Sequence, residues 1–284
     1  MSSSKSIASR LLALLAPPVS LCMGCGSPIR QPAAVFPELC LACAAAIPWI
    51  ASPRCPLCGR GIGCPDCTRG DWAEHRSFIL NRSAVAYNDR MREWLGQYKY
   101  RGRESLAPLF GRMMVRAYKR LEEEQRQIQR NRSWRIDLVT CVPVSPSRLL
   151  ERGFNQAEVL AKAVASDAGV KFVPLLERSR DTEKQSLKSR SERLQDMKKA
   201  FVPRADAADL LRHELAGGSG SRRRRDYFST TEPVLDPQRI LRFLLVDDIY
   251  TTGSTIGACS SQLESLASAL GRQSEIYSLT WARS

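Results

Sequence analysis

Histidine is scarce in this chain of 284 residues, and long apolar runs are missing. The two histidines, His75 and His213, stand among polar residues, which argues against Ser-His-Asp catalysis and histidine-based metal sites. No apolar stretch approaches the roughly 20 residues that a membrane-spanning helix needs. The N-terminal segment has a short apolar run that ends at Pro17 and Pro18, and no small-residue cleavage site follows. We therefore expect a short N-terminal helix and a cytoplasmic protein.

Basic residues outnumber acidic residues by a wide margin. The chain has 43 Lys and Arg residues against 29 Asp and Glu residues, which gives a formal net charge of +14. Such a surface favours anionic partners such as nucleic acid, phosphates or lipid headgroups. The alternative interpretation is that the charge serves solubility alone.

Eight of the ten cysteines form four C-x-x-C pairs. They are Cys22, Cys25, Cys40, Cys43, Cys55, Cys58, Cys64 and Cys67. Two C-x-x-C turns can place four thiolates at the corners of a tetrahedron around Zn²⁺. Disulfides explain four such pairs poorly in a reducing compartment. The pattern therefore predicts that these eight cysteines bind one or two zinc ions.

Glycine follows the first and third cysteine pairs, at Gly26 and Gly59, but not the second and fourth. A glycine at this place lets the turn adopt a positive φ and direct its amides at the sulfur. This alternation of pairs with and without a glycine predicts two zinc ribbons, one formed by the first two pairs and one by the last two. A cross-braced pairing, or a single metal, is the alternative because the last intervening loop is short. Cys141 and Cys259 stand in apolar surroundings and are predicted to be core residues.

The pattern changes after about residue 71, where helical and strand-like segments alternate. Amphipathic helices are predicted within 91–121, 147–170 and 254–270. Strands are predicted at 136–144, 171–178, 199–203, 240–248 and 275–282. This order predicts an α/β fold with a parallel sheet and helices on both faces.

Two domains are expected from these changes of pattern. The first, residues 1–70, would hold the N-terminal helix and a double zinc ribbon, and the second would span 71–284. A segment at about 206–238 has no apolar period and contains Gly/Ser residues followed by Arg222 to Arg225. We interpret it as a flexible insertion, either a solvated loop or a phosphate-binding one.

The segment LLVDDIYTTGST, residues 244–255, combines a buried strand, two aspartates and a hydroxyl-rich turn. In an open parallel sheet, ligands bind beyond the carboxyl ends of the strands, where Asp247 and Asp248 are expected. Two adjacent carboxylates can bind a ribose diol or Mg²⁺. The turn that follows supplies amides, hydroxyls and a permissive glycine at a helix N-terminus, which suits a phosphate. Its residues are Thr251, Thr252, Gly253, Ser254 and Thr255.

This segment resembles the phosphoribosyl-pyrophosphate signature of the type I phosphoribosyltransferases. The resemblance implies that the two aspartates bind the ribose hydroxyls, together with Mg²⁺, and that the turn binds the 5-phosphate. It also places the family's pyrophosphate loop after the strand LVTCVPV, and its flexible hood in the basic segment from Arg178. Candidate residues for these pyrophosphate contacts are Val144, Arg152, Arg178, Lys184 and Lys188.

The whole chain is similar to the ComF family of competence proteins. The similarity rests on the cysteine pairs and on the segments YKYRGRESLAPLF, VPVSPSRLLERGFNQAEVLA, RSRDTEKQSLKSRSERLQDMKKAF and SLTWAR, with RGFNQA the most distinctive. Departures are Asp196, where the family often has asparagine, the long insertion, and the missing glycine after the second and fourth cysteine pairs. The resemblance implies a factor in DNA uptake during natural transformation.

Three functions are compatible with these features. The first is a phosphoribosyltransferase that acts on an unidentified acceptor. The second is a module for single-stranded DNA, in which Trp72, Trp94 and Tyr98 either stack on bases or pack in the core. The third, implied by the resemblance alone, is a zinc-stabilised scaffold for a helicase or for DNA-uptake proteins.

Overall fold

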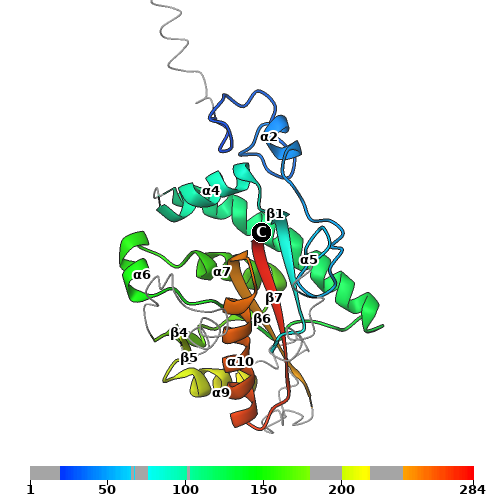
Figure 1. The fold of residues 1–284 in the computed structure, drawn as a ribbon, viewed down its shortest axis with the longest axis vertical. Helices are drawn as coiled ribbons and strands as arrows, with labels where there is room; N and C mark the ends of the chain where they lie inside the picture. Colours follow the sequence, from blue (N-terminus) through cyan, green and yellow to red (C-terminus); the bar gives the residue numbers. More distant parts are fainter. Residues whose placement is uncertain (1–19, 65–66, 68–75, 101–102, 180–199, 218–238) are drawn as a thin grey trace, which may run out of the picture. The chain divides into compact units, whose positions relative to one another are not determined.

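The computed structural model describes residues 20–64, 67, 76–100, 103–179, 200–217 and 239–284 (Figure 1). Its contacts divide the chain into two compact units, Met1–Ile47 and Pro48–Ser284. The last two C-x-x-C pairs therefore lie in the larger unit, whereas the sequence suggested a boundary after residue 70. Among the described residues, no helix is long and apolar enough to cross a membrane.

The smaller unit is built from turns around a short helix, α2 (Leu41–Ala45). Isolated bridges join Leu21 to Pro28 and Pro32 to Cys40. Phe36 and Leu39 are buried within it. So short a segment has little apolar surface to bury, which makes a bound metal a natural source of its folding free energy.

The larger unit contains a five-stranded parallel sheet in the order β1-β7-β6-β2-β3. Strands β1, β7 and β6 are labelled in Figure 1. Its strands are β1 (Leu80–Ala86), β2 (Leu138–Cys141), β3 (Lys171–Phe172), β6 (Leu241–Tyr250) and β7 (Ser274–Arg283). In the central strand β6, Leu244, Leu245 and Val246 are all buried. Consecutive residues of a strand point to opposite faces, so both faces of the sheet are covered, as the sequence predicted.

The described helices of the larger unit are α4 (Asp89–Tyr100), η2 (Glu104–Leu106), α5 (Ala107–Ile128), α6 (Pro146–Arg152), α7 (Gln156–Ala168), α9 (Ala207–Gly217) and α10 (Ser254–Ala269). Three of them, α5, α7 and α10, cover the faces of the parallel sheet. Helix α5 packs on β1 and β7 while α7 packs on β2 and β6, and the two helices contact each other. A Cβ on Gly111 of α5 would lie 3.0 Å from the Cβ of Ala163 in α7, so glycine permits this close packing. Helix α10 covers β6 and β7 from the other side.

The structure differs from the sequence prediction in several elements. Strand β1 was not predicted, because its segment LNRSAVA mixes buried polar and apolar residues. Strands β4 (Leu176–Arg178) and β5 (Phe201–Pro203) pair antiparallel in a separate small sheet. The expected insertion begins with helix α9, because Ala207 and Leu211 pack into the core. The predicted N-terminal helix and residues 218–238 lie outside the described residues.

Candidate functional site

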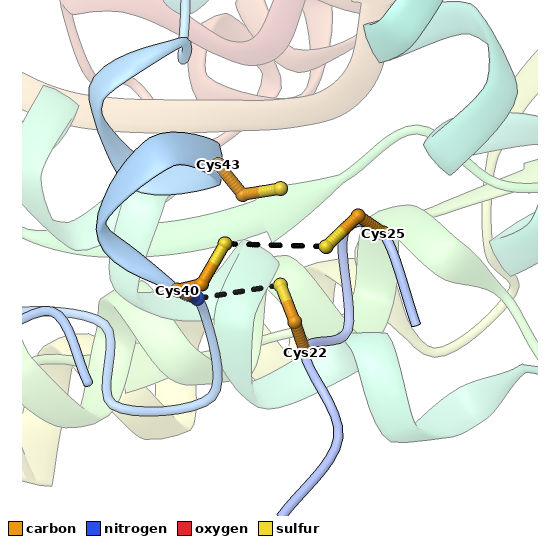
Figure 2. Close-up of side chains that lie close together, drawn as sticks. All are labelled: Cys22, Cys25, Cys40 and Cys43. Carbon is orange, nitrogen blue, oxygen red and sulfur yellow. Dashed lines mark hydrogen bonds between the residues drawn. The ribbon is translucent and has the colours of Figure 1, made fainter. Parts of the chain in front are cut away.

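The eight cysteines gather into two groups of four, in sequential order. The groups are Cys22, Cys25, Cys40 and Cys43, and Cys55, Cys58, Cys64 and Cys67, with the Sγ atoms of each group within 4.8 Å of one another. A tetrahedron with Zn–S bonds of about 2.3 Å has S···S edges of about 3.8 Å. The Sγ atoms of Cys25 and Cys40 lie 3.9 Å apart (Figure 2), and those of Cys58 and Cys64 lie 3.4 Å apart. Both groups therefore fit a zinc ion, and each is formed by two consecutive pairs rather than by a cross-braced arrangement.

Backbone geometry and charge both suit the first group of cysteines, which we call the first cluster, to binding a metal ion. Gly26 has φ of 73°, as the alternation of glycines predicted, and the amide of Cys40 donates to Sγ of Cys22 at 3.3 Å (Figure 2). Hydrogen bonds from Ser27 lower the pKa of Cys25 to about 6. Burial and the neighbouring thiols raise the pKa of Cys43. Four thiolates cannot ionise together without a cation to balance them, and a divalent metal supplies that balance.

The second group, which we call the second cluster, is fastened to the first strand of the parallel sheet. Asn81 donates from its backbone to the carbonyl of Leu57 at 2.7 Å and from its side chain to that of Cys58 at 3.1 Å. Arg82 reaches the carbonyl of Pro56 at 3.0 Å. Gly59 has φ of 72°, and a Cβ there would meet the carbonyl oxygen of Asn81 at 2.5 Å. Strand β1 and this cysteine turn are thus fitted directly against each other.

The switch point of the parallel sheet lies between β2 and β6. Strand β2 leads to α7 on one face of the sheet, and its neighbour β6 leads to α10 on the other. Loops that leave in opposite directions from adjacent strands form the usual ligand site of such sheets. The amide of Val142 donates to the carbonyl of Val246 at 2.9 Å, which places the loop after β2 beside Asp247.

Asp247 and Asp248 lie within β6, which extends two residues further than predicted because β7 pairs with it up to Tyr250. Strand β2 ends opposite Val246, so the aspartates project beyond the sheet on that side only. Asp248 is buried and its Oδ2 forms an ion pair with Nζ of Lys99 at 2.6 Å. Burial and the charge of Asp248 raise the pKa of Asp247 to about 8, although Lys99 opposes the shift. This carboxylate pair is therefore short of positive charge and suited to a cation or to hydroxyl donors.

The turn after β6 begins helix α10. Gly253 is its N-cap with φ of 83°, a conformation that residues with a side chain rarely adopt. Thr251 and Thr252 are exposed, and Oγ1 of Thr252 lies 2.9 Å from Oγ of Ser254. Hydroxyls and amides therefore gather at the N-terminus of a helix of 16 residues, where the helix dipole favours an anion.

The RGFNQA block fixes the loop on the opposite side of the switch point. The side chain of Asn155 accepts from the amide of Ala157 at 3.0 Å and donates to the carbonyl of Val142 at 3.1 Å. This residue thus caps α7 and holds the end of β2 at once. Arg152 donates to Gln156 at 3.0 Å and to the hydroxyl of Tyr100 at 3.0 Å, with its guanidinium 4.9 Å from the Tyr100 ring centroid. These contacts fix the side chain of Arg152, which is therefore not free in solvent.

The remaining predicted residues are dispersed. Val144 is half-buried in the loop after β2, and Arg178 lies in β4 with its guanidinium 5.4 Å from the Phe201 ring centroid. Lys184 and Lys188 lie outside the described residues. Cys141 and Cys259 are buried, as predicted, and burial raises the pKa of both thiols.

Two of the three aromatics considered for base stacking, Trp94 and Tyr98, are buried and therefore pack in the core instead of stacking on bases. The third, Trp72, lies outside the described residues.

Comparison with known proteins gives two relatives. The chain is 29% identical over 229 residues to the competence protein ComFC of Streptococcus pneumoniae (strain ATCC BAA-255 / R6), which covers 80% of this chain and 81% of that protein. It is 26% identical over 225 residues to the competence protein ComFC of Bacillus subtilis (strain 168), covering 77% of this chain and 75% of that protein. The resemblance to the ComF family is confirmed. No family model matches the chain.

Sequence reasoning missed several residues around this edge of the sheet. Lys99 and Tyr100 stand in the segment YKYRGRESLAPLF, which carried the ComF resemblance without a role for either residue. Tyr100 is 63% exposed, unlike the buried aromatics that were considered for base stacking. Arg283 joins the second cluster to the turn after β6. No local pattern marks these residues, because each acquires its role from contacts with distant parts of the chain.

Proposed function

We propose that this protein acts in DNA uptake during competence and that its switch point binds a 5-phosphoribosyl group. The competence role is supported by the names of the two ComFC relatives, which align with most of the chain. We place the protein in the cytoplasm as part of this proposal, because eight cysteines arranged as zinc ligands suit a reducing compartment. Two zinc ions would stabilise the fold.

One observation carries the ligand proposal: the aspartate pair and the hydroxyl-rich turn occur together at the switch point. The ion pair with Lys99 engages Oδ2 of Asp248, and the amide of Asp248 donates to Oδ1 of Asp247 at 2.8 Å. Each carboxylate keeps a second oxygen that can accept from a ribose hydroxyl. The turn Thr251–Thr255 would bind the 5-phosphate through its amides and hydroxyls.

Mg²⁺ fits the same carboxylates. It prefers oxygen ligands and usually binds through one or two carboxylates together with the phosphates of its substrate. When bound with phosphoribosyl pyrophosphate, it would neutralise charge on the pyrophosphate. Lys99 and Arg152 supply further positive charge at this edge, and their existing contacts hold both side chains in place.

Titration calorimetry with phosphoribosyl pyrophosphate and Mg²⁺ tests this proposal directly. We expect the unchanged chain to bind and the double variant Asp247→Ala, Asp248→Ala to lose binding by at least about 100-fold, because two charge-assisted contacts disappear. Asp137→Ala, which changes an aspartate at the far end of β2, is the matched control and should bind normally. Equal binding by all three proteins, or none by the unchanged chain, would contradict the proposal.

Single-stranded DNA is the proposed macromolecular ligand. The exposed Tyr100 ring, with Arg152 held on it, combines a stacking surface with a cation next to the switch point. The net charge of +14 supports contacts with phosphates. Fluorescence anisotropy should show that Tyr100→Ala weakens binding of an oligonucleotide by about 5-fold or more, since one stacked base contributes about 1–3 kcal/mol. Tyr87→Ala, which changes a half-buried tyrosine just before the start of α4, is the control.

Turnover is a second candidate function. Cations flank the same sheet edge as the aspartates, so a departing pyrophosphate would find stabilising charge there. A pyrophosphate-release assay over a panel of nucleobases distinguishes it from ligand binding alone.

A further inference from the structure

Arg283 forms a bridge between the second cluster and the turn that begins α10. Its Nη2 donates to Sγ of Cys58 at 3.5 Å. Its Nη1 donates to the carbonyl of Thr251 at 2.9 Å and to that of Tyr250 at 3.3 Å. One planar group thus touches a predicted zinc ligand and the first residue of the proposed phosphate turn.

The position of this bridge is fixed by the parallel sheet. Arg283 lies opposite Tyr250 in the register of β7 and β6, and the amide of Ser284 donates to the carbonyl of Tyr250 at 3.0 Å. The guanidinium also lies 4.7 Å from the centroid of the Tyr250 ring. The side chain is therefore held by the cysteine turn, the end of β6 and the Tyr250 ring, so we expect a shift at one end of the bridge to move the other.

The positive charge of Arg283 links the bridge to the metal site. Arg283 is only 5% exposed, and its partners among the described residues are Sγ of Cys58 and the backbone oxygens of Tyr250, Thr251 and Ser284 rather than an Asp or Glu side chain. A buried guanidinium is costly unless an anion lies beside it. Zinc held by four thiolates keeps a net negative charge and accepts N–H···S bonds. The contact to Cys58 and the contact to Thr251 belong to one rigid guanidinium, so the position of the cysteine turn is linked to that of the turn after β6.

The packing around the bridge points the same way. Cys55, Cys58 and Cys64 belong to one hydrophobic core cluster with Tyr250 and residues of α10. Zinc at these cysteines would therefore stabilise the core on which α10 packs. The N-terminus of the same helix forms the turn.

We propose that Arg283 is a positioning residue that couples the second cluster to the turn Thr251–Ser254, so that zinc at the cluster and a phosphate-bearing ligand at the turn each strengthen the binding of the other. The coupling is reciprocal, as any linkage between two binding sites must be. Its ligand half rests on the proposed function, and its structural half concerns zinc and the turn alone. The first cluster takes no part in it.

Zinc release from the full chain tests the reciprocal coupling. The protein is loaded with zinc, mixed with the chromogenic chelator 4-(2-pyridylazo)resorcinol, and followed with and without phosphoribosyl pyrophosphate and Mg²⁺. We expect the ligand to slow the release of one of two zinc ions by about 5-fold or more. Arg283→Met should abolish this protection. Arg242→Met, which changes an arginine paired with Glu275 at the opposite end of β7, should keep it.

A second variant and a second measurement keep the test decisive. Arg283→Lys retains the charge but lacks the fork that spans both contacts, so its protection should be reduced. Hydrogen exchange at the amides of Thr251–Ser254, measured without ligand, should be faster in Arg283→Met than in the unchanged chain, with faster release of one zinc.

The outcomes separate this inference from the proposed function. Ligand binding with equal zinc release in its presence and absence would overturn the coupling and leave the proposed function intact. Failure of any ligand to bind would contradict the proposed function, and the exchange experiment would then decide alone. Unchanged exchange at the turn in Arg283→Met would overturn the inference.

Discussion

The two cysteine clusters have the same local sequence pattern but different surroundings. Each begins with a C-x-x-C turn followed by a glycine at positive φ, and each brings four Sγ atoms within 4.8 Å. Contacts that hold the first cluster join residues of the small N-terminal unit, as in the bond from Cys40 to Cys22. Contacts of the second cluster reach β1, through Asn81, and β7, through Arg283. One motif thus belongs to a separate unit, and the other is part of the core of the larger unit.

Metal should therefore serve two different purposes. In the first cluster, zinc would hold together a short segment that buries little apolar surface. In the second, three of the four cysteines are packed in the core with Tyr250, Ile256 and residues of α10. Loss of that zinc should weaken the parallel-sheet unit itself, including the edge where Asp247 lies.

The largest expected effect contrasts one serine substitution in each cluster. Cys58→Ser should lower the unfolding midpoint of the larger unit by about 10 °C or more, because the free energy of zinc binding contributes to its folding. Cys22→Ser should leave that midpoint within about 2 °C. All five tryptophans lie in the larger unit, so their fluorescence during heating measures it selectively.

Similar losses of stability from both substitutions would break the comparison. The first cluster would then have to be counted as part of the folded core of the larger unit.

A matched pair of glycine substitutions sharpens the comparison further. Gly26 and Gly59 have nearly the same φ, so alanine at either position costs about 1–2 kcal/mol of backbone strain. A Cβ on Gly26 meets nothing within 4 Å, whereas a Cβ on Gly59 would lie 2.5 Å from the carbonyl oxygen of Asn81. Gly59→Ala should therefore cost about 3 kcal/mol in total, with zinc released faster from that cluster.

Denaturant unfolding followed by tryptophan fluorescence measures Gly59→Ala, and zinc release measures both variants. If Gly26→Ala and Gly59→Ala changed zinc release equally, the close packing of Gly59 against β1 would contribute nothing to the stability of the second cluster.

A smaller effect contrasts an enclosed carboxylate with an exposed one in the same unit. The pKa of Asp247 is raised to about 8, so between pH 6 and 8 the unfolded chain has already lost this proton while the folded chain still holds it. Stability should therefore fall as pH rises through this window, and Asp247→Asn should remove that dependence. The variant should gain about 1–2 kcal/mol at pH 8 relative to pH 6. Denaturant midpoints at the two pH values measure the difference.

Asp206 provides the control for this pH experiment. Its pair with Arg204 lowers the pKa of the carboxyl, so its contribution is complete above pH 6 and is lost only in acid. Asp206→Asn should consequently leave the dependence between pH 6 and 8 unchanged. A flat profile for the unchanged chain would contradict the raised pKa of Asp247.

Short-range patterns account for what the sequence predicted well. The pairing of cysteines follows from the reach of C-x-x-C turns and from the glycines after Cys25 and Cys58. The strand through Val246 and the helix from Ser254 follow from an apolar run and an amphipathic period. Both signals lie within a dozen residues, and the structure confirms these elements.

Long-range contacts account for what the sequence missed. Strand β1 mixes Asn81, Arg82 and Ser83 with apolar residues, and these polar groups are buried only because distant partners satisfy them. Lys99 and Arg283 likewise gain their partners across the fold, at separations that no periodicity reveals. The place of the second cluster in the core depends on the same contacts, which explains why its cysteines were assigned to a separate ribbon domain.

Hydrogen exchange with and without phosphoribosyl pyrophosphate and Mg²⁺ tests the central claim most directly, because it reports on both regions at once. We predict slower exchange at residues 142–145 and 251–255, on the two sides of the switch point, and no change at residues 20–47. Protection confined to residues 20–47, or none in either region at saturating ligand, would contradict the claim that the ligand site belongs to the sheet edge beside the second cluster.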